Sequence, residues 1–106
     1  MTGAQKVFDP IAFKETTRAQ WDGAADAWNR WSPLLDRWLG SATEMMFDMT
    51  HVQTGSRVLD VAAGAGGQTM AAARRVGPTG YVLATDFSPA ILRHTAENAQ
   101  IGRAHV

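Results

Sequence analysis

The chain has 106 residues, enough for one small domain, and its 45% hydrophobic and 19% charged residues are an ordinary globular composition. Ten basic and ten acidic residues cancel without forming a basic stripe, which argues against nucleic acid or an anionic membrane as the partner. The absence of cysteine excludes disulfides and thiolate metal sites. The N-terminus lacks the apolar core of a signal peptide, and no apolar stretch reaches the roughly 20 residues of a membrane span, so we expect a cytoplasmic protein with a small neutral partner.

The first 54 residues are predicted to form a helical region that acts as a lid or brace. Asp9 and Pro10 are typical of a helix N-cap and first helical position, ahead of a helix over residues 11–22. Ser32 and Pro33 are expected to interrupt the helical pattern, with Ser32 capping a second helix.

Large apolar side chains dominate this helical region. The four tryptophans are predicted to belong to the core rather than to an aromatic cage for a cation, with Trp21 and Trp28 best placed to border a pocket. The apolar residues of the second helix share one broad face, which we expect to lie against the sheet: Leu34, Leu35, Trp38, Leu39, Met45, Met46 and Met49.

The strongest functional signal begins at residue 57. Val58, Leu59 and Val61 form the short apolar run of a buried parallel strand. Gly64 to Gly67 allow a tight turn, and a helix is predicted over residues 68–76. Residues 55–100 are therefore expected to form a strand–helix–strand–helix unit.

The second strand of that unit is predicted over residues 81–85 and ends in Asp86. Asp86 lies 20 residues past Gly66, the spacing at which a carboxylate accepts hydrogen bonds from a ribose diol bound over the first loop. Both strand tips are expected to open onto the same crevice. Ser88 and Pro89 then predict the start of a helix over residues 90–99, with Ile91 and Leu92 facing inward and Arg93, Glu97 and Asn98 outward.

The glycine pattern discriminates between nucleotide ligands. A dinucleotide fingerprint that starts at Gly64 would need a third glycine where Thr69 stands, and a P-loop would need a lysine, of which none follows residue 14. Asp60, four residues before Gly64, would repel a pyrophosphate but attract an ammonium group. The loop therefore favours a cationic or zwitterionic ligand.

These residues resemble the first motif of the class I S-adenosylmethionine-dependent methyltransferases, V-L-D-x-G-x-G-x-G, which corresponds here to residues 58–66. Residues 8–100, including 21–28 and 76–80, are similar to the methyltransferase type 11 branch that contains the quinone-biosynthesis C-methyltransferases. The resemblance implies the N-terminal half of a Rossmann-like α/β fold, with S-adenosyl-L-methionine as the cofactor and a small molecule as the methyl acceptor.

The resemblance also implies roles for individual residues. Asp60 and the loop from Ala62 to Gly66 would hold the methionine end of the cofactor, Asp86 the ribose hydroxyls, and Phe87 the adenine. Core packing of Phe87 is an equally supported alternative. The predicted cofactor-binding set is Asp60, Ala62, Ala63, Gly64, Ala65, Gly66, Gln68, Asp86, Phe87 and Ser88.

Two residues depart from the family pattern. Ala62 stands where the family usually has a glycine, and its methyl group is tolerable if the backbone keeps a negative φ. Ala65 stands where quinone methyltransferases often have a threonine, so only backbone contacts to the cofactor are expected there. Both changes predict a somewhat lower affinity.

The length predicts an incomplete pocket, because the family fold uses about seven strands and this chain supplies two convincing ones. A third-strand carboxylate and the acceptor-binding loops are missing, so we expect weak cofactor binding and no turnover by this chain alone, and no catalytic residue is assigned. The last six residues, 101–106, match one reading frame of a common short-read sequencing adapter. The alternative is a natural loop at Gly102 followed by a third strand from His105.

Other functions are less well supported by the sequence. A non-catalytic cofactor-binding domain and an NAD-dependent oxidoreductase are the two alternatives, and Asp60 argues against the second. His94 and Glu97 are predicted to be a solvated helix face rather than metal ligands, so no metal is expected. The sequence leaves the acceptor and the oligomeric state open.

Overall fold

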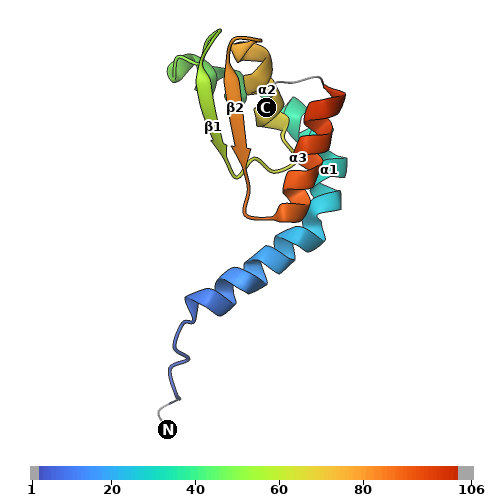
Figure 1. Ribbon diagram of the computed structural model, residues 1–106. Coiled ribbons are helices and arrows are strands. Elements are labelled where there is room, and N and C mark those ends of the chain that lie inside the picture. Colours follow the sequence, from blue (N-terminus) through green and yellow to red (C-terminus); the bar gives the residue numbers. More distant parts are fainter. Residues whose placement is uncertain (1–2, 103–106) are drawn as a thin grey trace.

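The computed structural model describes residues 3–102 and shows three helices and a two-stranded parallel sheet (Figure 1). The elements are, in order, α1 (Pro10–Met49), β1 (Arg57–Val61), α2 (Gly67–Val76), β2 (Tyr81–Thr85) and α3 (Pro89–Ile101). The predicted α/β class and the order of the strand–helix–strand–helix unit are confirmed. The expected third strand from His105 lies outside the described part of the chain. The expectation for the origin of residues 101–106 stays a prediction, and of these residues only Ile101, the last of α3, and Gly102, its C-cap, are described.

α1 begins where the sequence predicts. Asp9 is the N-cap, and its Oδ1 accepts hydrogen bonds from the amides of Ile11 at 3.0 Å and Ala12 at 3.1 Å. Pro10 occupies the first turn, where its missing N–H costs no hydrogen bond. The local chemistry of these residues is sufficient to define this end of the helix.

The predicted interruption at Ser32 and Pro33 is wrong, because α1 continues through Pro33 without a break. A proline inside a helix removes one backbone hydrogen bond and crowds the preceding turn, which can kink a helix without ending it. The Ser32 hydroxyl does not cap a new helix but donates to the Trp28 carbonyl at 2.7 Å, which is a bond within the same helix.

The length of α1 gives the molecule its shape. Its first turns extend away from the rest of the chain, whereas its later turns run behind the sheet (Figure 1). The radius of gyration is 17.0 Å and the extents are 62 × 28 × 24 Å, compared with a radius of about 13 Å for a compact chain of this length. None of the helices within residues 3–102 combines the length and the apolarity that crossing a bilayer requires.

The two strands pair in parallel, with Val58 opposite Val82 and Asp60 opposite Ala84. The core lies between the sheet and the helices and consists of Phe47, Ala72, Ala73, Val76 and Val82. The other face of the sheet bears Leu59, Val61 and Leu83, which are exposed. Parallel sheets are usually covered on both faces, so this open face is unusual for the class.

α1 buries a different face from the one predicted. Its buried residues are Ala25, Thr43 and Phe47, and it packs against α3 and α2. The tryptophans predicted to be core are instead 41–76% exposed. Small residues allow close helix contact, so the narrow face that contains Ala25 and Thr43 packs inward in preference to the wider aromatic one. Most of the predicted apolar face is also exposed: Leu34, Trp38, Leu39, Met45, Met46 and Met49.

Candidate functional site

Three residues of the loop between β1 and α2 have left-handed backbone. Gly64 and Gly66 have φ angles of 62° and 98°, which glycine adopts without a Cβ clash. Ala62 has a φ of 60°. The methyl group is expected to be tolerable only at a negative φ, and this condition is not met. An alanine in this region carries a conformational cost of about 1–2 kcal/mol. Strain is therefore stored at the residue that departs from the family pattern.

Asp86 connects the two strand ends. Its Oδ2 accepts a hydrogen bond from the Gly64 amide at 3.0 Å, and its Oδ1 accepts one from the Ser88 amide at 2.8 Å. A carboxylate has about four lone-pair sites, so acceptor capacity remains for hydroxyl groups of a ligand. Asp86 thus fixes the glycine loop and retains the chemistry expected of a ribose contact.

Asp60 is the fourth residue of β1 and pairs with Ala84, two residues before Asp86. Its Oδ2 accepts a hydrogen bond of 2.5 Å from the Thr69 hydroxyl, and Thr69 is fully buried. Thr69 occupies the position where a dinucleotide fingerprint would have its third glycine. The threonine therefore orients the carboxylate that the sequence assigns to the ammonium end of the ligand.

α3 holds the loop from the other side through two residues that the sequence did not indicate. Thr95 Oγ1 donates to the Gly64 carbonyl at 2.6 Å, and Asn98 Nδ2 donates to the Ala65 carbonyl at 2.8 Å. The prediction that Asn98 faces outward is wrong, because its amide also reaches Asn29 Oδ1 of α1 at 3.0 Å. The periodicity of α3 alone cannot show this, since both contacts come from distant parts of the chain.

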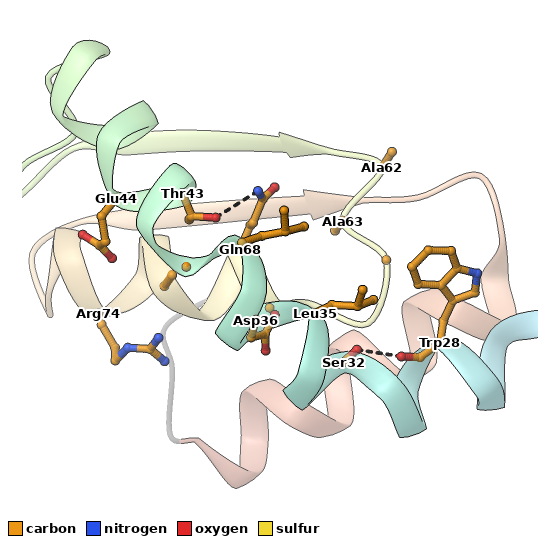
Figure 2. Close-up of a pocket in the computed structure, with 15 residues that line it drawn as sticks. Trp28, Ser32, Leu35, Asp36, Thr43, Glu44, Ala62, Ala63, Gln68 and Arg74 are labelled. Atoms are coloured by element: carbon orange, nitrogen blue, oxygen red, sulfur yellow. Dashed lines mark hydrogen bonds between the residues drawn. The ribbon is translucent and has the colours of Figure 1, made fainter.

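A cavity of about 420 Å³ lies between α1 and the start of α2, and the loop residues Ala62, Ala63 and Gly64 form part of its wall (Figure 2). Trp28 borders this cavity, as predicted, whereas Trp21 is absent from its lining. The other lining residues shown in Figure 2 include Leu35, Asp36, Thr43, Gln68 and Arg74. The volume falls in the range of small-molecule sites.

Polar side chains of α1 and α2 meet in the wall of the cavity. Gln68 Nε2 donates to Thr43 Oγ1 at 3.2 Å (Figure 2). Burial raises the pKa of Asp36, and the positive charge of Arg74 opposes this shift. The carboxylate of Asp36 lies directly against Gly67, since a Cβ added at Gly67 would be 2.0 Å from Asp36 Oδ1. Asp36 is a further acidic group beside the loop, in addition to Asp60 and Asp86, and motif spacing does not reveal it.

Phe87 and Ser88 follow Asp86. The Phe87 ring is partly exposed, and the Arg18 guanidinium carbon lies 4.9 Å from its centroid. Ser88 is fully buried and is the N-cap of α3, where its Oγ accepts a hydrogen bond from the Ile91 amide at 3.2 Å. The same hydroxyl donates to Asp22 of α1. A direct contact from Phe87 or Ser88 to the cofactor stays a prediction.

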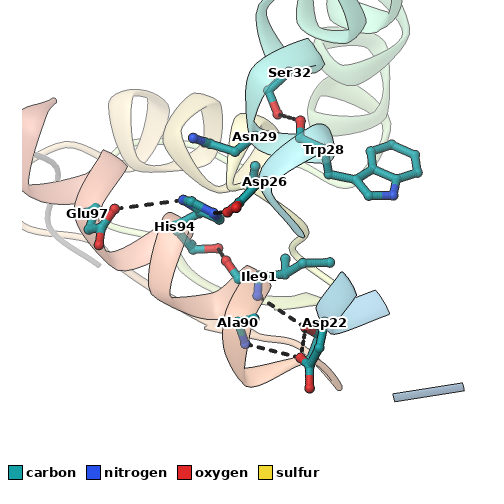
Figure 3. Close-up of polar contacts among 12 residues, drawn as sticks. Asp22, Asp26, Trp28, Asn29, Ser32, Ala90, Ile91, His94 and Glu97 are labelled. Carbon is teal, nitrogen blue, oxygen red and sulfur yellow. Dashed lines mark hydrogen bonds and ion pairs between the residues drawn. The ribbon is translucent and has the colours of Figure 1, made fainter. Parts of the chain in front are cut away.

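A row of polar contacts joins α1 and α3, with Asp22 and Asp26 on α1 facing residues of α3 (Figure 3). The Ser88 hydroxyl lowers the pKa of Asp22, with further contributions from the Ala90 amide and from nearby arginines and a partial opposing effect of burial. His94 Nε2 lies 2.8 Å from Asp26 Oδ1. The solvated-face interpretation of His94 is therefore wrong, since the ring is partly buried and paired with α1. Within residues 3–102, no three His, Cys, Asp or Glu side chains form a group that could hold a metal ion.

Comparison with known proteins assigns the family. Residues 37–105 match the model of the ubiE/COQ5 methyltransferase family. The chain belongs to this family. Membership confirms the resemblance that the residues around Asp60 and Asp86 indicate.

Curated relatives of this family member are methyltransferases. The chain is 35% identical to the 2-phytyl-1,4-naphtoquinone methyltransferase of Nostoc punctiforme over 80 residues, which cover 68% of this chain and 35% of that protein. It is 49% identical to the ubiquinone/menaquinone biosynthesis C-methyltransferases UbiE of Burkholderia mallei and Burkholderia thailandensis over 43 residues, which cover 41% of this chain and 18% of those proteins. The chain thus spans about a third or less of the relatives it matches. No solved structure matches it significantly.

Proposed function

We propose that this chain forms the part of an S-adenosyl-L-methionine-dependent methyltransferase that binds the methyl donor. The observation that carries the proposal is the arrangement of Asp60 and Asp86 at the same end of two paired parallel strands, with the glycine loop between them. Ligands of open α/β sheets bind at this end of the strands. The cytoplasmic location expected from the sequence stays a prediction.

The residues present fit the chemistry of the donor. A Cβ added at Gly64 would meet no heavy atom within 4 Å, so there is open space over the loop. The carboxylate of Asp36 lines the cavity and that of Asp60 is held by Thr69, and each could complement an ammonium group. Asp86 retains acceptors for ribose hydroxyls. The same carboxylates disfavour the pyrophosphate of NAD.

The donor supplies an activated methyl group on a sulfonium, so the protein's task is to position it and to exclude water. In this proposal the glycine loop and the first turn of α2 hold the methionine portion, and Asp86 fixes the ribose. The relatives' names point to a quinone-type acceptor for the whole protein. We infer a lipophilic aromatic acceptor of this class, which requires residues beyond those that place the donor.

Isothermal titration calorimetry with S-adenosylhomocysteine and with NAD tests the proposal. We expect S-adenosylhomocysteine to bind weakly, with a Kd of about 0.1–1 mM, and NAD to bind at least tenfold more weakly. Asp86→Asn keeps the size of the side chain but removes its charge and one acceptor, so it should weaken S-adenosylhomocysteine binding by about tenfold.

Asp48→Asn is the matched control, because Asp48 pairs with Arg75 on the exposed side of α1. It should leave the affinity for S-adenosylhomocysteine unchanged. Two results would overturn the proposal. One is tighter binding of NAD than of S-adenosylhomocysteine. The other is no detectable binding of S-adenosylhomocysteine at ligand concentrations about 5 to 10 times the upper expected Kd of about 1 mM.

A further inference from the structure

Two successive carbonyl groups of the glycine loop point to side chains of α3. The Gly64 carbonyl accepts from Thr95 Oγ1 at 2.6 Å and the Ala65 carbonyl accepts from Asn98 Nδ2 at 2.8 Å. Thr95 is 2% exposed, so water cannot replace its hydroxyl without local opening. Each of these hydrogen bonds joins a buried or partly buried donor to the loop backbone rather than to another side chain.

The peptide groups on both sides of Gly64 are thereby fixed. Its amide donates to Asp86, which directly follows β2, and its carbonyl accepts from Thr95 of α3, so both polar groups of the residue are held. The contact is also steric at Gly66, where a Cβ would lie 3.1 Å from the Thr95 methyl carbon. The loop therefore fits the surface of α3 closely, in one backbone conformation.

Asn98 connects the loop to α1 as well. Its amide nitrogen donates to Asn29 Oδ1 at 3.0 Å in addition to the Ala65 carbonyl. Both amide hydrogens are used, which fixes the orientation of the side chain. Asn98, Ala65 and Asn29 all line a neighbouring cavity of about 370 Å³, so one residue of α3 joins the loop to α1 in the wall of that cavity.

We propose that Thr95 and Asn98 are positioning residues for binding of the methyl donor. They turn the two carbonyl dipoles of the loop toward α3 and away from the cavity that Ala62, Ala63 and Gly64 line. A carbonyl oxygen that turned into this cavity would repel the carboxylate of the donor's methionine portion. This inference rests on the proposed function, because it assigns a role in binding the same ligand.

A loop that is held in its binding conformation loses little entropy when the ligand binds. A loosened loop occupies the binding conformation for only part of the time, and the apparent affinity falls in proportion to that fraction. Removal of the Thr95 hydroxyl leaves the partly buried Gly64 carbonyl without this hydrogen-bond partner, which favours such other conformations. The affinity for the donor should therefore depend on a hydroxyl that the ligand does not touch.

The matched pair Thr95→Val and Thr95→Ser tests this dependence. Valine keeps the shape of threonine and lacks the hydroxyl, whereas serine keeps the hydroxyl and lacks the methyl group. We expect Thr95→Val to weaken S-adenosylhomocysteine binding by about tenfold and Thr95→Ser by less than about twofold, measured by calorimetry where urea titration shows each variant folded. Asn98→Asp, which replaces the donor with an acceptor, should weaken binding at least as much.

Amide hydrogen exchange of Gly64 to Gly66 in the ligand-free protein provides a second readout. Exchange should be faster in Thr95→Val than in Thr95→Ser or in the wild type. Thr50→Val is the control, because it removes a hydroxyl-to-carbonyl bond of 2.8 Å to Met46 at the far end of α1. It should change neither the affinity nor the exchange of the loop.

The outcomes separate this inference from the proposed function. Equal weakening by Thr95→Val and Thr95→Ser would assign the effect to packing of the methyl group and would overturn a positioning role of the hydroxyl. Unchanged affinity and unchanged loop exchange in a folded Thr95→Val variant would overturn it as well. If the wild type does not bind S-adenosylhomocysteine, the proposed function fails. Faster loop exchange in Thr95→Val would then show that the Thr95 hydroxyl fixes the loop without a role in binding this ligand.

Discussion

The glycine loop and the first turns of α1 differ in what holds them. The loop contains three residues with left-handed backbone, a conformation that local preference disfavours for alanine and does not select for glycine. It is fixed by Asp86, which follows β2, and by Thr95 and Asn98 of α3. The start of α1 has favourable local chemistry in the Asp9 cap, yet it extends from the molecule with Ile11 and Phe13 exposed. A segment with strong local signals forms without tertiary support, whereas the loop that forms the site depends on that support.

Within the glycine loop, the largest effect is expected from a side chain placed where the loop touches α3. Gly66→Ala should lower the free energy of unfolding by about 2–3 kcal/mol, because a left-handed alanine costs about 1–2 kcal/mol and its Cβ also presses on Thr95. Gly64→Ala has the left-handed cost without a steric neighbour, so it should lose about 1–2 kcal/mol. Urea unfolding measures both values, and equal losses would show that the contact between the loop and α3 adds nothing.

A smaller effect of opposite sign is expected at Ala62. Ala62→Gly should raise the free energy of unfolding by about 0.5–1 kcal/mol, because it relieves the positive φ of 60° at a modest entropic cost. Ala63→Gly is the control next to it in the chain, and it should lower stability by about 0.5–1 kcal/mol. A loss of stability in Ala62→Gly would contradict the assignment of strain to this residue.

The polar contacts between α1 and α3 predict that the stability of the fold depends on pH. The Ser88 hydroxyl lowers the pKa of Asp22 in the folded protein, so the stabilisation is present above the ordinary pKa and is lost as the pH falls through the lowered value. Asp22→Asn should therefore be less stable than the wild type at pH 7, and the difference should shrink below about pH 4. Thermal unfolding across this pH range measures it. A difference that persists unchanged in acid would mean that the charge of Asp22 is unimportant.

The smallest effect is expected at the free end of α1. Phe13→Ser changes a side chain that is 60% exposed, so the free energy of unfolding should change by less than about 0.5 kcal/mol. Phe47→Ala, in the core at the other end of the same helix, should cost about 3–5 kcal/mol. A large effect of Phe13→Ser would show that this end packs against something, which would remove the contrast with the loop.

The sequence by itself determined the features that short-range chemistry controls. The Asp9 and Ser88 caps, the residues of β2, the glycine turn and the parallel order of the two strands were all predictable, because hydrogen bonds between near neighbours and the apolar pattern decide them. The motif around Asp60 also predicted the family, because it needs certain residue types at fixed spacing.

Only the tertiary structure decided which faces of the helices are buried and what holds the loop. Ala25, Thr43 and Phe47 face inward and the tryptophans outward because close packing of α1 on α3 and α2 favours the face with small residues. Thr95 and Asn98 acquire their roles because residues more than 30 positions earlier in the chain lie against α3. Such contacts have no periodic signature, since their free energy comes from groups that meet only when the chain has folded.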